Sequence, residues 1–237
     1  MEATRTQKKE GKNNKMKKRN LEQLLELKKQ LDAGICLNHT GKMRGIFSLS
    51  TSVLLNKQCA KNANIAGSIC SHCYARSLLA MRKNNQPKLA RNTELLTREI
   101  LPVEVLPTIN NLYFRFEAFG DLNNAIQVVN YFNICNKNKR ANFALWTKNA
   151  RFIDQAIKKY GVKKPKNLNI VYSSMFINAV ADHIIEKYPF IDKIFTVYDS
   201  KYIKENSIDI NCGARSCASC LKCYKKNNIK YISEKLK

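Results

Sequence analysis

Two groups of cysteines dominate the chemistry that this sequence suggests. The chain has 237 residues and nine cysteines. Seven cysteines fall into two groups, spaced C-x10-C-x2-C for Cys59, Cys70 and Cys73, and C-x4-C-x2-C-x2-C for Cys212, Cys217, Cys220 and Cys223. Thiols at such short spacings form either disulfides or the ligands of a metal.

The sequence outside the cysteines favours metal over disulfides. The N-terminus has no apolar run like that of a secretory signal, and no stretch is long and apolar enough to span a membrane. We therefore expect a cytoplasmic protein with reduced thiols and no membrane partner, in which all seven grouped cysteines bind metal. Cys36 and Cys135 stand apart from the groups and are interpreted as small buried side chains.

The identity of the metal stays open between an iron–sulfur cluster and zinc. Zinc prefers closed tetrahedral sites, and two C-x2-C pairs, one from each group, would make such a site. The segment CASCLKC, residues 217–223, instead has three cysteines at successive i+3 positions. That run is common in ferredoxin-like ligation and favours an iron–sulfur cluster, of the 4Fe–4S type.

The charge of the chain predicts a polyanionic partner. It carries 42 Lys and Arg against 18 Asp and Glu, a formal net charge of +24. Residues 1–20 read as a disordered basic arm, and residues 224–237 form a Lys-rich tail. An alternative function is therefore a non-catalytic, metal-stabilised protein that binds nucleic acid through arm and tail. A module that acts on a host protein is a third alternative.

The elements that position the cysteines begin with a helix. Residues 21–42 are expected to form an amphipathic helix and a linker. One face of this helix would carry four leucines and pack on the body of the protein, with Lys28 interrupting the stripe and Leu27 at its edge; the four are Leu21, Leu24, Leu25 and Leu31.

The rest of the chain alternates between strand and helix patterns. Strands are predicted at residues 112–119, 141–147, 168–174 and 193–199, and helices at 123–136, 150–161 and 178–188. Gly161 is well placed to end its helix. The fold class is therefore α/β, with parallel βα repeats in an open sheet or a full or partial (β/α) barrel. We expect this domain to span residues 43–210, followed by a Cys-rich metal-binding segment and basic tail at 211–237.

Polar residues recur where the predicted strands end. In parallel α/β folds the loops after the strands converge on one site. Each residue alone is an ordinary turn or cap residue, but recurrence at four strand ends predicts a shared polar pocket. The residues are Glu117 and Asp121; Trp146, Thr147 and Lys148; Ser173 and Ser174; and Tyr198 and Asp199.

Several segments resemble the phage gene product 88 family. The resemblance covers roughly residues 43–224 and is carried by FRFEAFGDLNNAIQVVNYFNICNKNKRANFALWTKN, SICSHCYA, Arg91-Asn92, IFTVYDS and INCGARSCASCLKCY. It implies an origin in a bacteriophage or another mobile element. To our knowledge the family has no assigned activity, so the resemblance implies no reaction.

A second resemblance is to radical S-adenosylmethionine enzymes. In that family C-x3-C-x2-C, with an aromatic residue before the last cysteine, holds a [4Fe–4S] cluster on a partial (β/α) barrel and leaves one iron open for the cofactor. Cys70-Ser71-His72-Cys73 matches the second half, with His72 at the aromatic position. Cys59 departs from the pattern because ten residues, not three, precede Cys70. A longer loop is tolerable, since doubling its length costs about 0.6 kcal/mol of closure entropy.

This second resemblance implies roles for the residues at the strand ends. Glu117 and Asp121 lie where that family binds the methionyl amino group, and the cysteines from 212 to 223 would resemble an auxiliary cluster. We expect catalytic roles for Glu117, Asp121 and Lys148, and cofactor contacts from Glu117, Asp121, Ser173 and Asp199. The cofactors implied are an iron–sulfur cluster and S-adenosylmethionine, in an enzyme whose substrate the sequence does not identify.

Overall fold

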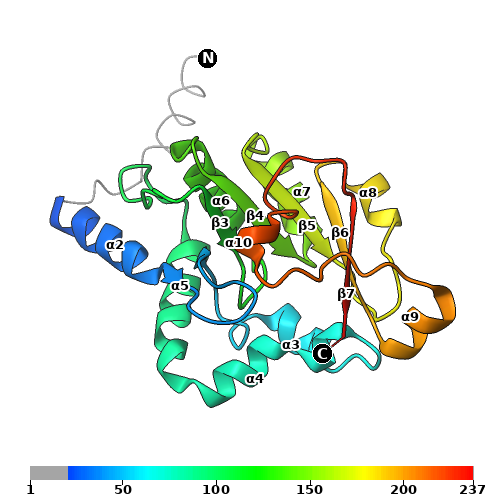
Figure 1. The fold of residues 1–237 in the computed structure, drawn as a ribbon. Helices are drawn as coiled ribbons and strands as arrows, with labels where there is room; N and C mark the ends of the chain where they lie inside the picture. The colour runs from blue at the N-terminus through cyan, green and yellow to red at the C-terminus, as the bar shows by residue number, and fades with distance from the viewer. Residues whose placement is uncertain (1–20, 237) are drawn as a thin grey trace, which may run out of the picture.

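A seven-stranded sheet forms the centre of the computed structural model, which describes residues 21–236 (Figure 1). The strands lie side by side in the order in which they occur along the chain. β1 runs antiparallel to β2, and all later neighbours are parallel. The strands are β1 (Cys36–Leu37), β2 (Phe47–Leu49), β3 (Tyr113–Phe116), β4 (Asn142–Thr147), β5 (Leu168–Ser173), β6 (Lys193–Tyr198) and β7 (Tyr231–Lys235).

This strand order confirms the predicted α/β class with parallel βα repeats. A doubly wound sheet reverses its strand order at a switch point, whereas a (β/α) barrel keeps it sequential. The sheet here is sequential throughout, with β1 and β7 as the edges of the described part. The sheet also extends past both predicted limits of the domain at 43–210, since β1 lies before them and β7 after them. The predicted basic arm, residues 1–20, lies outside the described residues.

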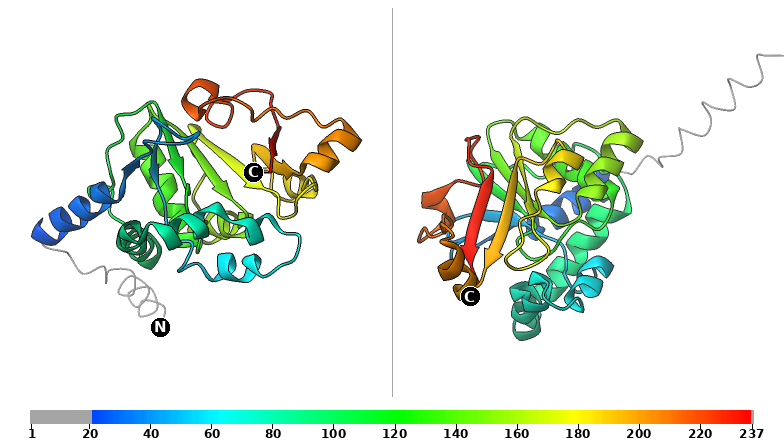
Figure 2. Two further views of the ribbon diagram at one scale, coloured as in Figure 1. Left: turned by 60° about the horizontal axis from the view of Figure 1, so that its bottom comes forward. Right: turned by 90° about the vertical axis from the view of Figure 1, so that its right-hand side faces the viewer.

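Helices cover one side of the sheet, here termed the helix face (Figures 1 and 2). Because side chains alternate along a strand, Phe114, Phe116 and Phe143 all point to this face and pack against α5 to α7 in the main core. The helices are α2 (Leu21–Gly34), α3 (Lys57–Ala63), α4 (Tyr74–Met81), α5 (Gln86–Arg98), α6 (Ala125–Lys137), α7 (Ala150–Tyr160), α8 (His183–Lys187), α9 (Ser200–Asn206) and α10 (Cys217–Cys220), with 3-10 turns η1 (Ile69–His72) and η2 (Lys83–Asn85).

Local signals in the sequence explain where α6 and α7 begin and end. The side chain of Asn124 caps α6 by accepting a hydrogen bond from the Gln127 amide, 2.9 Å away. Gly161 ends α7 with a φ of 66°, the left-handed conformation that glycine adopts without strain. Both helices lie where the hydrophobic period predicted them, and Gly161 has the predicted role.

The predicted buried face of the first helix is wrong in part: Leu24 packs on the main core and Leu31 is buried as predicted, but Leu21 and Leu25 are not. Leu21 is 71% exposed and Leu25 is 58% exposed, whereas Leu27 and Leu31 are buried. The reason is the contact of α2 with α5, which sets the rotation of the helix. There the Asn92 amide donates to the carbonyl of Gly34, 3.1 Å away, and a Cβ on Gly34 would lie 2.1 Å from the Asn92 side chain.

The C-terminal segment covers the opposite side of the sheet, here termed the cysteine face (Figure 2). Tyr224 packs with Ala144 in one small core of this face, and Ile232 packs with Val171 and Phe195 in another. The predicted Lys-rich tail is thus partly a sheet strand, because β7 pairs with β6 and buries Ile232. Among the helices of residues 21–236, none has the length and apolar character to cross a membrane.

Candidate metal centre

Cys59, Cys70 and Cys73, here termed the first thiol group, come together in the loop that follows β2. Cys59 lies on α3, Cys70 lies on η1, and Cys73 separates η1 from α4. Burial raises the pKa of the Cys59 thiol, and the charges of Asp121, Cys70 and Cys73 raise it further. Such mutual influence requires short separations, so the ten-residue gap does not keep Cys59 away from the C-x2-C turn.

Local hydrogen bonds fix the position of this loop. The side chain of Asn56 caps α3 by accepting from the amides of Gln58 and Cys59, both at 3.0 Å, and its Nδ2 donates to the carbonyl of Asp121. The Ile69 amide donates to the carbonyl of Met175, which follows β5, at 2.9 Å. The loop that starts after β2 is therefore tied to the ends of both β3 and β5.

Asp121 is the carboxylate whose charge has the larger effect on the pKa of Cys59, ahead of Glu117. It is buried, and its Oδ1 accepts from the Thr147 hydroxyl at 2.5 Å and the Leu122 amide at 2.7 Å. Its Oδ2 accepts from the Lys148 amide at 3.0 Å. Burial raises the pKa of Asp121, and its charge acts on Cys59 and Cys70. The carboxylate thus joins the ends of β3 and β4 beside the thiols.

Glu117 is occupied by contacts within the protein. Its carboxylate accepts from the Thr51 amide and hydroxyl, from Gln127 Nε2 at 2.6 Å, and from the Tyr131 hydroxyl at 2.5 Å. Burial raises its pKa to about 7. The backbone has a φ of 55° here, and a Cβ at Gly120 would lie 2.5 Å from the carboxylate. These contacts suit a positioning role, in which Glu117 holds the loop to α6.

Of the other predicted site residues, Lys148 and Ser173 lie beside the first thiol group, whereas Asp199 lies in a helix cap. Lys148 Nζ donates to the Ser173 hydroxyl at 2.6 Å, and its charge lowers the pKa of Cys70 against the effect of burial. Asp199 caps α9 by accepting from the Tyr202 amide at 2.8 Å, and its other oxygen accepts from Asn178 at 2.6 Å. These hydrogen bonds lower the pKa of Asp199. Its carboxylate is therefore used in a local cap.

The other predicted strand-end residues have varied surroundings. The hydroxyls of Ser174 and Thr196 share a buried hydrogen bond of 2.9 Å. Tyr198 stacks on Tyr202, with 5.9 Å between ring centroids. Trp146 points to the cysteine face, away from the first thiol group's loop, and packs in both small cores there.

Cys212, Cys217, Cys220 and Cys223, here termed the second thiol group, gather on the cysteine face. Burial raises the pKa of Cys223 to about 12, Arg115 lowers it, and the other three thiols raise it. The Cys217 amide donates to the carbonyl of Lys42 at 2.6 Å, and the Cys212 amide donates to the carbonyl of Ser233 at 2.9 Å. These backbone hydrogen bonds hold the segment that carries the four thiols against the loop at Lys42 and against β7.

Sequence reasoning missed the two cations beside the second thiol group. Lys42 Nζ lies 2.6 Å from the Cys212 carbonyl, 3.4 Å from Cys212 Sγ and 2.5 Å from Glu234 Oε1. Arg115 is the strongest charged influence on the thiols of Cys217 and Cys223. A charged residue within the apolar strand YFRF was the available signal for Arg115, while Lys42 had none.

Tyr74 is influenced electrostatically by a cysteine of each thiol group. The residue is 56% exposed, and its hydroxyl donates to the carbonyl of Ala118. Burial of the hydroxyl raises its pKa, Arg115 lowers it, and the charges of Cys73 and Cys217 raise it further. As their side chains stand, no three His, Cys, Asp or Glu of residues 21–236 form a group that could hold a metal ion.

The model of the gene product 88 family matches residues 4–235, a range that includes both thiol groups. The chain belongs to the gene product 88 family. No match to it was found among curated proteins or among solved structures. Membership of the gene product 88 family confirms the first resemblance. The resemblance to radical S-adenosylmethionine enzymes finds no support in these comparisons.

The two solitary cysteines of this gene product 88 family member lie outside both groups. Cys135 is fully buried on α6 within the main core, as a small apolar side chain would be. Cys36 lies on β1, where its sulfur accepts from Lys88 Nζ at 3.5 Å. The proposed ligand set of seven cysteines stays a prediction.

Proposed function

We propose that this gene product 88 protein is an iron–sulfur protein whose first thiol group holds a cluster at the carboxyl end of the sheet. The observation that carries the proposal is the convergence of three thiols from one loop beside Asp121 and Lys148. Buried thiols ionise reluctantly, and a metal supplies the positive charge that makes thiolates stable there.

The spacing of the cysteines favours a cluster over zinc. A closed zinc site built from C-x2-C pairs would draw one pair from each group. The segment CASCLKC has three cysteines at successive i+3 positions, a run that is common in ferredoxin-like ligation.

Three protein ligands suit a reactive cluster. With three thiolates bound, one iron of a cubane stays open, and when reduced such a cluster supplies an electron to S-adenosylmethionine bound there. Asp121 is suited to accept a hydrogen bond from the ammonium group of that cofactor, because its Oδ2 has one backbone donor. Lys148 and Ser173 offer donors for the carboxylate of the cofactor, and Glu117 supports the loop. The finer proposal is therefore a radical S-adenosylmethionine enzyme.

Metal analysis of anaerobically purified protein tests the coarser proposal. We expect brown protein with broad absorbance near about 400 nm and with iron and acid-labile sulfide. Cys70→Ser and Cys73→Ser should each lose the iron of the first group, while Cys36→Ser should keep it. Colourless protein that retains zinc after reconstitution with iron and sulfide would refute the cluster.

Product analysis tests the finer proposal. Dithionite-reduced protein with S-adenosylmethionine should form 5′-deoxyadenosine and methionine. Cys73→Ser should abolish the product, and Asp121→Asn should reduce it by about tenfold, the loss of one charge-assisted hydrogen bond. Cluster-loaded protein that neither binds nor cleaves the cofactor would leave an iron–sulfur protein without this activity.

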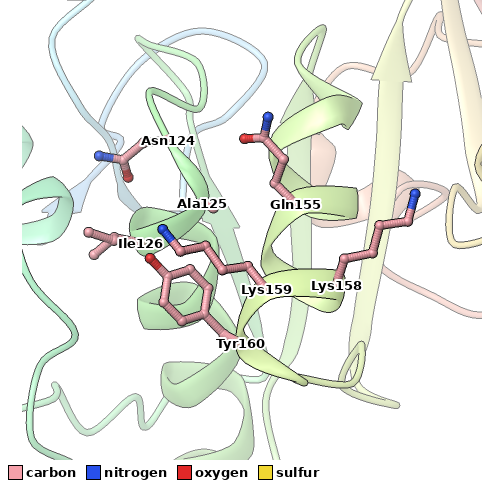
Figure 3. A pocket seen from close by; sticks show the side chains of 7 residues that line it. All are labelled: Asn124, Ala125, Ile126, Gln155, Lys158, Lys159 and Tyr160. Atoms are coloured by element: carbon pink, nitrogen blue, oxygen red, sulfur yellow. The ribbon is translucent and has the colours of Figure 1, made fainter. Parts of the chain in front are cut away.

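Contact with nucleic acid is a second proposal, supported by charge. The net charge is +24, and basic side chains line a surface hollow of about 630 Å³ between α6 and α7. Figure 3 shows Lys159 beside Tyr160 in this hollow, with Lys158 on the same helix. The Lys159 ammonium lies 5.3 Å from the centre of the Tyr160 ring. Lysines beside an aromatic ring suit a phosphate backbone with unstacked bases.

A further inference from the structure

Two buried N–H groups on the cysteine face have no hydrogen-bond partner. They are Nε of Arg115 and Nε1 of Trp146; the acceptor Oδ1 of Asn169, whose amide donates to the Cys223 carbonyl, also has no partner. A buried donor without an acceptor costs free energy on the order of 1–3 kcal/mol, so native proteins satisfy nearly all of them. Two such donors in one place indicate an acceptor that binds there.

The two donors belong to one arrangement. Arg115 on β3 stacks on Trp146 on β4, with 4.3 Å between the guanidinium carbon and the ring centre. Phe195 on β6 packs on Trp146, with 4.5 Å between ring centroids. The guanidinium and the indole are thus held in fixed orientations on the sheet.

The second thiol group surrounds these donors. Trp146 packs with Cys217 and Cys223 in one small core, and with Cys212 and Cys223 in the other. Arg115 is the largest charged influence on Cys217, Cys223 and Tyr224. The four thiols are therefore the group of potential acceptors that shares these two small cores with the unpartnered donors.

The charge of Arg115 also favours a negatively charged group at this site. No carboxylate among residues 21–236 forms an ion pair with Arg115, although other basic side chains have such partners. A partly buried cation beside neutral thiols lacks a counter-charge, which is costly. Four thiolates on a doubly charged metal centre carry a net charge of about −2. Arg115 would offset part of it, since Lys42 already has Glu234 as its partner.

We propose that the second thiol group binds a closed iron–sulfur cluster, and that Arg115 and Trp146 donate N–H hydrogen bonds to its sulfurs. All four cysteines are ligands, so this cluster has no open iron. The thiolates of such a cluster accept N–H hydrogen bonds, and its bridging sulfides add acceptors beyond the four thiolates that a zinc ion with the same ligands would offer. The proposal concerns the second group alone and does not depend on a cluster at the first.

Arg115 and Trp146 are positioning residues that tune the cluster. A hydrogen bond to a cluster sulfur stabilises the more negative, reduced state and so raises the reduction potential. Removal of either donor should therefore make the potential more negative. Loss of Arg115 removes a charge as well and should have the larger effect.

The experiment uses the whole protein after anaerobic reconstitution. The cluster signal that disappears in Cys223→Ser and persists in Cys73→Ser identifies the second centre by electron paramagnetic resonance. Trp146→Phe keeps the ring and removes the N–H, so the iron content should stay unchanged while this signal shifts to a more negative potential. Arg115→Gln should shift it further. Arg98→Gln, an exposed change on α5, is the matched control and should leave the potential unchanged.

A second measurement needs no variant at either donor. In the wild-type protein, electron–nuclear double resonance should detect exchangeable protons coupled to the second cluster, and their signals should vanish in deuterated water. Zinc in place of iron, unchanged iron in Cys223→Ser, or an unchanged potential in both Trp146→Phe and Arg115→Gln would overturn the proposal. Loss of iron from Cys73→Ser alone would leave the first site intact as a proposal and refute this one.

Discussion

The two thiol groups of this protein differ in the balance of charge around them, although each has both an acid and a base nearby. The first lies among loops beside the carboxylates of Asp121 and Glu117, whose charges raise the pKa of Cys59 further than burial alone. In the first group the charge of Lys148 also acts on Cys70. The second lies against the sheet beside Arg115, which opposes the effect of burial on Cys217 and Cys223. In the second group the charge of Glu234 also acts on Cys212. Three thiols with acids suit a site that binds a further cationic group. Four thiols with cations suit a closed, structural one.

The two thiol groups also differ in the parts of the fold against which they pack. The second group joins β7, α10 and the sheet through two small cores, so its loss should disturb the C-terminal part of the fold. The first group packs on a separate small core of four buried side chains, outside the main core. Reactive sites are commonly found in such loops above a rigid sheet, because there the chain can rearrange at small cost in stability.

The largest expected effect comes from comparing one cysteine of each group. Cys223→Ser should remove the second centre and lower the free energy of unfolding by more than about 4 kcal/mol, since metal binding contributes directly to folding. Cys73→Ser should lose the first centre but cost less than about 1 kcal/mol. Anaerobic chemical denaturation with iron analysis measures both quantities.

The two solitary cysteines serve as controls for that comparison. Cys135→Ser should destabilise the core by about 1–3 kcal/mol through a buried hydroxyl, while Cys36→Ser should change little. Neither should change the iron content. Equal losses of stability in Cys223→Ser and Cys73→Ser would remove the distinction between a structural and a reactive centre.

The next effect tests the tight packing around the first group. Gly120→Ala should lower the free energy of unfolding by about 1–3 kcal/mol, because its Cβ would lie 2.5 Å from both the Thr51 carbonyl and the Glu117 carboxylate. Gly213→Ala, in the second region, is the matched control. There the nearest atom to the new Cβ would be the Ile210 carbonyl at 3.8 Å. Thermal denaturation should separate the two variants, and similar melting temperatures would contradict the geometry.

A pH comparison tests the carboxylate beside the first group. Burial raises the pKa of Glu117 from 4.5 to about 7, so the folded protein holds this proton more tightly than the unfolded chain. Its contribution to stability is complete below about pH 4.5 and is lost as the pH rises through about 7. Between about pH 5 and pH 8 the wild type should lose on the order of 2 kcal/mol more than Glu117→Gln. Parallel pH profiles of the two proteins would show that Glu117 does not titrate in this range.

The smallest effect lies outside both thiol groups. Deletion of residues 1–20 removes eight basic and two acidic residues, a net charge of +6. Affinity for nucleic acid should fall several-fold and its salt dependence should flatten, with the iron content unchanged. Fluorescence anisotropy at several salt concentrations measures this. Identical salt slopes for the two proteins would exclude the arm as a binding element.

Sequence alone determined the repeating part of the fold. Alternating and helical hydrophobic periods are local properties, and they identified the strands between residues 112 and 199, helices α6 and α7 and the helix stop at Gly161. The helix predicted at 178–188 is shorter in the structure, where α8 spans only His183–Lys187 and Asn178 has a φ of 64°. The short cysteine spacings likewise identified two groups of thiols. β1 and β2 escaped prediction because they have only two and three residues, and β7 did so because its sequence YISEK is largely polar. Such strands form through pairing with a neighbour that is distant in sequence.

Only the tertiary structure decided which side chains surround each thiol group. Contact with α5 turned α2 so that Leu27, not Leu25, is buried, because rotation about a helix axis depends on its partner. The path of the chain across the cysteine face brought Arg115 to cysteines about a hundred residues later, and no local period encodes such a separation. The carboxylates of Glu117 and Asp199 were both predicted to contact a cofactor. Burial by neighbours distant in sequence raises the pKa of Glu117, whereas Asp199 is used in a local helix cap at Tyr202 and in a hydrogen bond from Asn178.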